Sequence, residues 1–265
     1  MNKKTIQSVF LGMVLLLMYL PILILAVYSF MDSAIIGKSG SFTVKNYVYL
    51  FHSEDLRSMI FGTLILAVVV AVISTILGTL GAIGAFYSSK KFKRPIHLMN
   101  QIPVVNADVV TGFSICVLLI VFFKMDKASY VPLVIGLVSL CSPFVYLSVI
   151  PRLKQMDPQL YEAALDLGCS QFGALRKVVL PQLTSGIISG FMMSITLTLD
   201  DYFITTYTKP SMFDTISTYV VNATKGAQTD VKTALWALST IIFLIVIFVV
   251  IGMNHTGRKE NDHEI

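Results

Sequence analysis

The chain has 265 residues, of which 55% are hydrophobic and only 13% are charged. Soluble domains carry about 25% charged residues, so this composition predicts a protein of the lipid bilayer and excludes an aqueous domain of any size. The formal net charge is +5, but the basic residues form no patch that alternates with aromatic residues, which argues against nucleic-acid binding.

Six apolar segments predict six transmembrane helices. In chain order they cover roughly residues 9–30, 59–86, 99–123, 130–150, 183–205 and 234–253, and each approaches or exceeds the ~20 residues needed to cross a bilayer. The first is too long for the apolar core of a signal peptide and has no convincing cleavage site after it. We therefore predict an all-α, polytopic membrane protein in which residues 1–265 form a single transmembrane domain.

Glycines recur in two of these segments. Gly78, Gly81 and Gly84 lie at the end of the second, and Gly186 and Gly190 lie four residues apart in the fifth. Small residues let helix backbones approach closely in lipid, where no hydrophobic drive holds helices together. These glycines are therefore expected at helix–helix contacts.

The distribution of basic residues predicts the orientation of the chain. The N-terminus, residues 87–98, residues 151–182 and the C-terminal tail would lie on one face, and they carry 12 of the 20 lysines and arginines. Loops rich in lysine and arginine stay in the cytoplasm. Both termini and the loop at 151–182 are therefore expected on the cytoplasmic side.

The loop at 151–182 is too polar for the bilayer and predicts two short helices. Asp157 can cap the first helix and Pro158 suits its first position, while Gly168 can end it in a left-handed conformation. Ser170 can cap the second helix, and Pro181 is expected to stop that helix before the fifth span.

The first of these short helices has an apolar stripe of Leu160, Ala163, Ala164 and Leu167, with Glu162 on a different face. A helix that lies on lipid headgroups would need larger apolar residues and more lysine. The small-residue surface and the acidic face favour docking to a protein partner.

Carboxylates within or at the ends of spans are candidates for a substrate pathway. An aspartate at a helix centre costs about 2.5–3.5 kcal/mol to insert, so such residues usually face water or the bundle interior. Asp108 is placed near the membrane midplane, about ten residues into the third span, close to Asn106 and Thr111. The alternative is a packing role in which neighbouring helices satisfy its hydrogen bonds.

The outer end of the fifth span carries two further carboxylates. Asp200 shares a helical face with Ser185, Ser189 and Thr196, whereas Asp201 shares another face with Thr198 and Thr205. The alternative is that both carboxylates are interfacial and merely solvated. Carboxylates favour a cationic substrate, to which Tyr202 could add a cation–π contact.

The sequence Glu162-Ala163-Ala164, then Gly168, then Leu180-Pro181, before the fifth span, resembles the EAA loop of ABC-importer permease subunits. Phe42-Thr43-Val44-x-Asn46-Tyr47 after the first span agrees with this family. Leu199-Asp200-Asp201-Tyr202 is similar to the PotC-type permeases of spermidine/putrescine importers.

The resemblance implies a type I ABC importer permease fold in a bacterial inner membrane, and transport of spermidine or putrescine. It implies a second permease subunit, two ATPase subunits that hold ATP and Mg²⁺, and an extracytoplasmic binding protein. Glu162 would contact the ATPase, Ala163 and Ala164 would permit a close fit, Gly168 would turn the loop and Pro181 would end it.

Other functions remain as alternatives. The same architecture could import an amino acid, sulfate or ferric ion, although spans nearly free of lysine and arginine argue against an anion. A self-sufficient secondary transporter would need internal repeats or helices broken in paired positions, and the sequence predicts neither. The three cysteines and four histidines form no metal-ligand pattern, and no nucleophile–base pair is present. We therefore predict no metal, no cofactor bound by this chain and no enzymatic activity.

Overall fold

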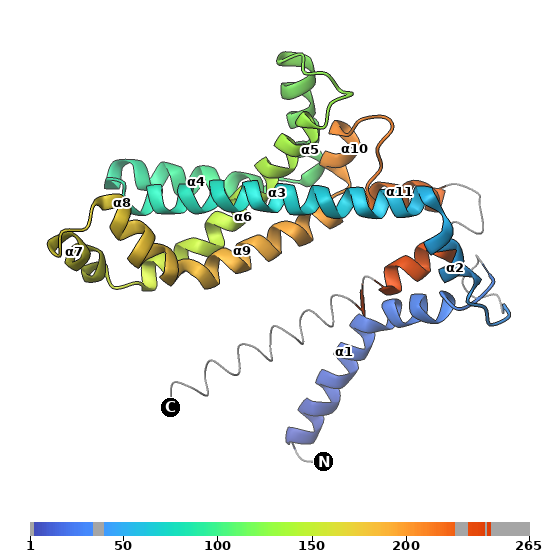
Figure 1. Ribbon diagram of the computed structural model, residues 1–265. Coiled ribbons are helices and arrows are strands. Elements are labelled where there is room, and N and C mark those ends of the chain that lie inside the picture. Colours follow the sequence, from blue (N-terminus) through green and yellow to red (C-terminus); the bar gives the residue numbers. More distant parts are fainter. Residues whose placement is uncertain (1–2, 34–39, 226–232, 242, 245–265) are drawn as a thin grey trace. The chain divides into compact units, whose positions relative to one another are not determined.

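The computed structural model describes residues 3–33, 40–225, 233–241 and 243–244 (Figure 1). The described residues are helical apart from loops and one isolated bridge between Met31 and Phe42. The helices are α1 (Lys3–Tyr28), α2 (Lys45–His52), α3 (Glu54–Tyr87), α4 (Lys90–Val105), α5 (Asp108–Cys116), α6 (Val131–Gln155), α7 (Pro158–Asp166), α8 (Gln171–Ala174), α9 (Leu180–Asp200), α10 (Phe203–Thr208) and α11 (Ile216–Lys225), with π-helical segments at Val117–Phe122 and Leu175–Val179.

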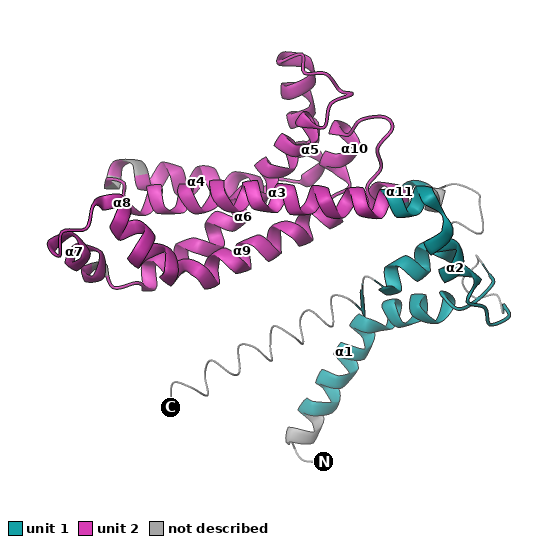
Figure 2. Cartoon of the chain, in the orientation of Figure 1, with its two compact units in different colours: residues 1–58, 220–265 teal, residues 59–219 magenta. Residues whose placement is uncertain are grey.

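The predicted all-α membrane architecture is confirmed. Among the described residues, four helices are long and apolar enough to cross a membrane, or five when a bent pair counts as one span. Half of the sixth predicted segment, 234–253, lies outside the described residues, and the described half, 234–241 and 243–244, is helical. The described part contains two compact units, residues 1–58 with 220–265 and residues 59–219 (Figure 2). The single domain over 1–265 stays a prediction.

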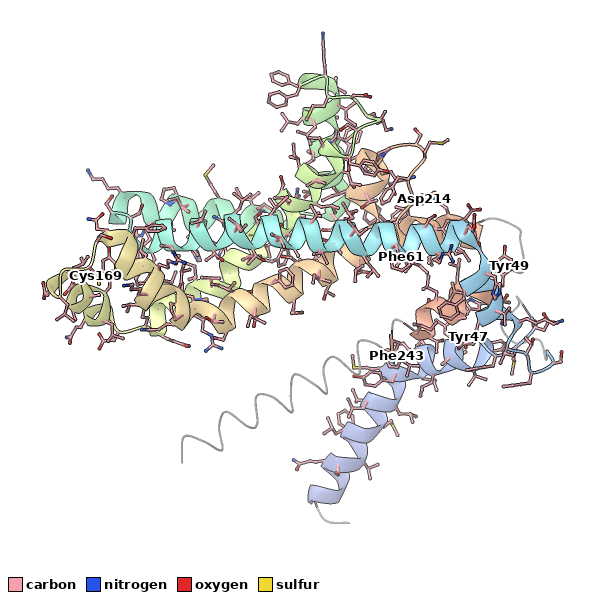
Figure 3. The ribbon with its side chains drawn as sticks, viewed as in Figure 1. Tyr47, Tyr49, Phe61, Cys169, Asp214 and Phe243 are labelled. Atoms are coloured by element: carbon pink, nitrogen blue, oxygen red, sulfur yellow. The ribbon has the colours of Figure 1, made fainter. Side chains whose placement is uncertain are left out.

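In the first unit, Asn46 and Tyr47 hold the turn after α1. The Asn46 side chain is buried and its Nδ2 donates hydrogen bonds to the carbonyls of Ser29 and Met31, at 2.8 and 3.0 Å. The Tyr47 hydroxyl lies 2.8 Å from Ser29 Oγ, and its ring lies 5.0 Å from that of Phe30. These contacts, around Tyr47 in Figure 3, give the Asn46-Tyr47 pair a structural role.

In the second unit, α6 and α9 pack closely because glycines lie between them. A Cβ atom built on Gly190 would lie 3.1 Å from the Cα of Val145, and one on Gly186 would lie 3.0 Å from the carbonyl oxygen of Ser148. The buried core around this contact includes Val149 and Leu183. The close approach predicted for this glycine pair is confirmed.

The three glycines near the end of α3 differ in how closely α6 approaches them. A Cβ on Gly78 would lie 2.6 Å from Val145 Cβ and 2.8 Å from the carbonyl oxygen of Ser142, so this glycine admits α6. A Cβ on Gly81 would make an ordinary 3.9 Å contact, and one on Gly84 would meet nothing within 4 Å. The expectation of close packing within the chain is therefore confirmed for Gly78 and wrong for Gly84.

This difference predicts unequal effects of two matched substitutions in one helix. Gly78→Ala should lower the thermal stability of the purified chain, because overpacking of a well-packed contact costs about 1–3 kcal/mol. Gly84→Ala should leave it unchanged. Thermal unfolding in detergent measures both, and equal midpoints for the two variants would contradict the packing.

Two predicted spans differ from their expected course. The third is not continuous: the helices Lys93–Val105 and Asp108–Phe122 meet at 105°. Asn106 and Ala107 between them have extended backbone, with ψ of 147° and 133°. The fifth ends at Asp200 rather than Thr205, and α10 begins after a two-residue break.

Pro181 does not stop the helix, contrary to the sequence-based expectation. Gln171–Asp200 runs as one 30-residue helix that could span the membrane. The π-helical segment ends at Val179, two residues before this proline, and the Leu180 N–H donates to the carbonyl five residues back, at Leu175. The wider turn changes the hydrogen-bond register where proline offers no N–H, and so accommodates its ring.

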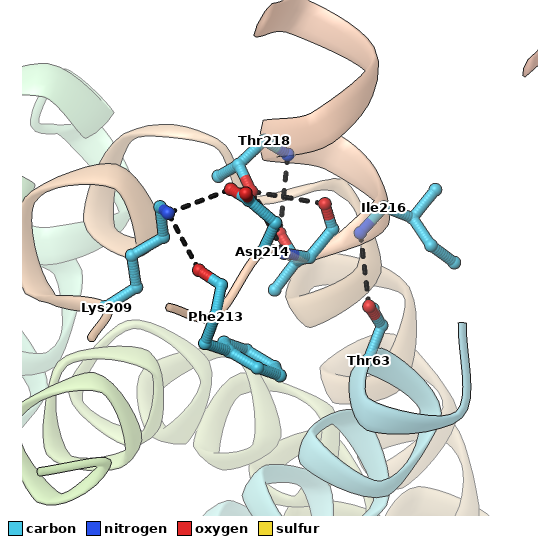
Figure 4. A network of polar contacts seen from close by, with 7 residues as sticks. Thr63, Lys209, Phe213, Asp214, Ile216 and Thr218 are labelled. Carbon is cyan, nitrogen blue, oxygen red and sulfur yellow. Dashed lines mark hydrogen bonds and ion pairs between the residues drawn. The ribbon is translucent and has the colours of Figure 1, made fainter. Parts of the chain in front are cut away.

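The segment after α10 is fixed to α3 by polar contacts (Figure 4). Lys209 Nζ lies 2.8 Å from Asp214 Oδ1 and donates to the carbonyl of Phe213 at 2.7 Å. The Ile216 N–H donates to Thr63 Oγ1 at 3.1 Å. These bonds hold the connection that follows the break between α9 and α10.

Candidate functional site

The predicted caps of the polar loop are present. Asp157 Oδ1 accepts a hydrogen bond from the Gln159 N–H at 2.9 Å, at the start of α7. Gly168 adopts φ of +85° just after α7, a conformation that glycine adopts without penalty. Ser170 Oγ accepts from the Gly173 N–H at 3.1 Å at the start of α8. The two-helix reading of this loop, in which Figure 3 labels Cys169, is confirmed.

The loop presents an apolar surface. Leu160, Leu167 and Phe172 are 45%, 86% and 75% exposed, and Ala163 is exposed among them. Phe172 was not predicted as part of this surface, because it lies outside the apolar stripe of the first short helix. Ala164 is only 8% exposed and is packed within this chain, and its expected role in permitting a close fit to a partner stays a prediction. Exposed apolar side chains gathered on one loop indicate a binding surface.

Glu162 is exposed beside this surface. Among the described residues it has no hydrogen-bond or ion-pair partner. Leu160 is exposed as well. Tyr161, between Leu160 and Glu162, packs against Tyr87, with 5.0 Å between the two ring centres. One face of α7 is therefore anchored and the other is available. The roles of Glu162, Ala163, Gly168 and Pro181 toward an ATPase stay predictions.

The helix breaks at 106–107 and 201–202 bring the predicted pathway residues together. A Cβ on Gly112 of α5 would lie 3.1 Å from the backbone nitrogen of Ile204 in α10, and Cys116 Sγ donates to the carbonyl of Tyr207 at 3.4 Å. The second contact lies further toward the C-terminus than the first in both helices, so α5 and α10 run parallel. The starts of α5 and α10 therefore lie at one end, which places Asp108 beside the Asp200–Asp201 pair.

The carboxylates at this end have different environments. Asp108 and Asp200 are exposed, whereas Asp201 is buried and lies close enough to Asp108 to interact with it electrostatically. Asp108 opens α5 instead of lying inside a continuous span, so the expected position ten residues into one helix is wrong. Asn106 Nδ2 donates to Thr111 Oγ1 at 3.0 Å and bridges the break beside it.

The two faces predicted for α9 are both present. Ser185, Ser189, Thr196 and Asp200 are exposed, whereas Thr198, Asp201 and Thr205 are buried. The Thr196 hydroxyl donates to the carbonyl of Met192 at 3.0 Å. Tyr202, half-buried, occupies the break itself.

Asp201 has a structural use in this chain. Its Oδ2 accepts hydrogen bonds from the backbone N–H and the hydroxyl of Thr205, at 2.7 and 2.8 Å, and its Oδ1 accepts one from the Ile204 N–H at 3.4 Å. The carboxylate thus satisfies the free N–H groups at the start of α10. Its contribution to a substrate pathway stays a prediction.

This use predicts that Asp201→Ala destabilises the chain. The substitution leaves buried donors of Thr205 without an acceptor, which costs about 1–3 kcal/mol. Asp200→Ala, a matched change at the exposed neighbour, should leave the unfolding temperature of the purified chain unchanged. Equal unfolding temperatures for the two variants would show that Asp201 does not cap α10.

The ends of α4 and α9 add to the negative character of this region. A helix C-terminus carries a partial negative charge, and α4 and α9 both end at a break. None of the three carboxylates forms an ion pair with a described basic residue. The described residues contain no group of three or more potential metal ligands. The carboxylates and helix ends of this region can attract a cation.

Paired helix breaks and Gly112 were not predicted. The isolated glycine in an apolar run was the available signal, since such a residue often marks a close backbone approach. Broken helices are typical of secondary transporters too.

Two curated relatives cover most of the chain. It is 29% identical over 245 residues to the spermidine/putrescine transport system permease protein PotC of Escherichia coli K12, covering 92% of this chain and 90% of the relative. It is 29% identical over 238 residues to the putrescine transport system permease protein PotI of the same strain, covering 85% and 81%.

Solved structures share the fold. A chain of a bacterial alginate ABC transporter, in complex with an alginate-bound periplasmic protein, superposes with a TM-score of 0.72 at 16% identity, over 92% of this chain and 91% of that one. A chain of an amino acid ABC transporter gives 0.51 at 18% identity, over 78% and 94%. The predicted ABC-permease fold is therefore confirmed.

The family model for the inner membrane component of binding-protein-dependent transport systems matches residues 77–256. This range contains the polar loop and both helix breaks. It identifies a membrane transport subunit and not an enzyme, as the sequence predicted. The chain therefore belongs to the family of binding-protein-dependent transport system inner membrane components.

Proposed function

We propose that this chain is a permease subunit of an ATP-driven importer of polyamines, and that it forms half of the translocation pathway. The observation that carries the proposal is the meeting of two helix breaks at Asp108 and Asp200. Spermidine and putrescine are protonated at neutral pH, and unpaired carboxylates bind protonated amines by charge-assisted hydrogen bonds. The names of the two relatives support the same substrate class.

The proposed assembly contains a second, similar permease, two cytoplasmic ATPase subunits and an extracytoplasmic binding protein. ATP and Mg²⁺ would bind to the ATPase subunits. The loop at 151–182 docks on an ATPase through Leu160, Ala163, Leu167 and Phe172, with Glu162 as the polar contact. Both termini lie in the cytoplasm, in keeping with the distribution of lysine and arginine.

The continuous helix Gln171–Asp200 couples the two regions. It begins at Gln171, within this docking loop (residues 151–182), and ends at Asp200, a length of about 45 Å at 1.5 Å per residue. Closure of the ATPase dimer displaces α7, and the long helix transmits that displacement to the break beside Asp201. The close packing of α9 on α6 makes the two helices move together.

Uptake of labelled spermidine and putrescine, by cells with and without this chain, tests the substrate class. We expect uptake to depend on the chain, on ATP and on an ATPase that co-purifies with it. ATP-dependent uptake of an amino acid, sulfate or ferric ion, and not of polyamines, would leave the importer role and overturn the substrate. Transport without any ATPase would overturn the importer role itself.

A further inference from the structure

A small pocket lies where α3, α4 and α6 meet, away from the docking loop's exposed face and from the helix breaks. It has a volume of about 140 Å³. Its lining combines apolar side chains of Ala85, Tyr146 and Ile150 with basic groups of Lys93, Arg94, His97 and Lys154. We call it the basic pocket.

No acidic side chain of the described residues forms an ion pair with the cationic groups of the basic pocket. The ion pair recorded among the described residues joins Lys209 to Asp214, on a different segment. Lys93 Nζ lies 4.7 Å from the centre of the Phe86 ring and donates to the Phe86 carbonyl at 3.4 Å, which orients the ammonium group and leaves its charge in place. Arg94 and Lys154 are exposed at the rim. An anion would therefore be attracted to the pocket.

The floor of the pocket indicates what kind of anion fits. Ala85, Tyr146 and Ile150 are 2%, 2% and 6% exposed and belong to the apolar core between α3 and α6. A small soluble anion gains nothing from an apolar floor, whereas a phospholipid offers a phosphate and an apolar body in one molecule. The combination of basic rim and apolar floor therefore matches an anionic lipid.

The position of the pocket along the spans points the same way. Ala85 lies two residues before the end of the span Glu54–Tyr87, and Lys154 lies one residue before the end of the span Val131–Gln155. Both spans therefore end at the pocket, at the level of the lipid headgroups. Basic pockets between transmembrane helices at this level are suited to anionic headgroups.

We propose that the basic pocket binds the phosphate of an anionic glycerophospholipid from the leaflet at that end of the spans. Lys93, Arg94 and Lys154 hold the phosphate, and Tyr146 and Ile150 contact the apolar part. Bound lipid ties the first turns of α4 to the end of α6, where the docking loop begins. The proposal concerns lipid binding alone and does not depend on which substrate is transported.

Native mass spectrometry of the full-length chain in detergent, titrated with phosphatidylglycerol or phosphatidylcholine, tests this site. The unsubstituted chain should bind phosphatidylglycerol in preference, and inorganic phosphate should not displace it. Equal binding of the two lipids, or displacement by inorganic phosphate, would overturn the proposal. Equal binding would show that the site does not recognise the charge of the lipid. Displacement by phosphate would show that the site binds a soluble anion.

A matched pair of variants assigns the binding to the pocket. Arg94→Gln/Lys154→Gln should weaken phosphatidylglycerol binding about 30-fold, since each basic residue near an anionic surface contributes a factor of about five. Lys124→Gln/Lys127→Gln removes the same charge from an exposed loop and should leave binding unchanged. Equal weakening by both pairs would overturn the pocket as the site.

Discussion

Replacement of Gly168 by valine should abolish most ATP-driven uptake while the protein stays in the membrane. The backbone at Gly168 has φ of +85°, and a left-handed conformation costs an ordinary L-residue about 1–2 kcal/mol, more when it is β-branched. Open space surrounds the position where a Cβ would lie, so the effect comes from the backbone and not from a clash. The expected loss is about tenfold or greater, since 1.4 kcal/mol corresponds to a factor of ten.

Two further variants make this prediction specific. Gly168→Asn should retain most uptake, because asparagine tolerates the left-handed conformation that ends α7. Glu162→Arg should lower co-purification of the ATPase without changing thermal stability, since the Glu162 side chain is exposed and has no described partner. Uptake is measured with labelled substrate and normalised to the amount of chain in the membrane. Normal uptake by Gly168→Val would show that the shape of the loop is not needed for coupling.

The docking loop could be predicted from the sequence because its signals are local. Asp157, Ser170 and Gly168 each act on backbone groups within a few residues, so residue type and spacing suffice to place the helix ends. The same applies to the two faces of α9, which follow from helical periodicity. Phe172 could not be found from the stripe on the first helix, because it lies on the second helix and its exposure depends on how the loop turns.

The helix breaks could not be predicted because tertiary contacts produce them. Nothing in the apolar run around Asn106 and Ala107 demands an end, and the bend is held by packing of Gly112 on α10. At Pro181 the error was the reverse. The sequence predicted that the proline ends a helix, whereas in the structure the helix continues past it after a π-helical turn. Both errors concern the course of a span. Because of the break at 106–107, Asp108 lies at the start of α5 and not in the interior of one continuous helix.

Asp108→Asn should reduce polyamine uptake by about 10- to 100-fold, with assembly on the ATPase unchanged. A hydrogen bond to a charged group contributes about 1.5–3 kcal/mol, and asparagine keeps the size of the side chain while it loses the charge. Asp108 is exposed and opens α5, and its side chain forms no hydrogen bond with another described residue. The folded chain should therefore tolerate the substitution. Initial uptake rates at several spermidine concentrations, with the amount of co-purified ATPase, measure both quantities.

Asp126→Asn is the matched control, because Asp126 is an exposed aspartate outside the helix breaks. Its Oδ1 accepts a hydrogen bond from the Ala128 N–H at 2.8 Å, which the asparagine oxygen can also accept. Uptake by this variant should equal that of the unsubstituted chain, and Asp108→Glu should recover part of the loss. Equal uptake by Asp108→Asn and Asp126→Asn would make Asp108 a residue of packing alone. The pathway would then have to rest on Asp200, whose exposed carboxylate ends the helix that leaves the docking loop.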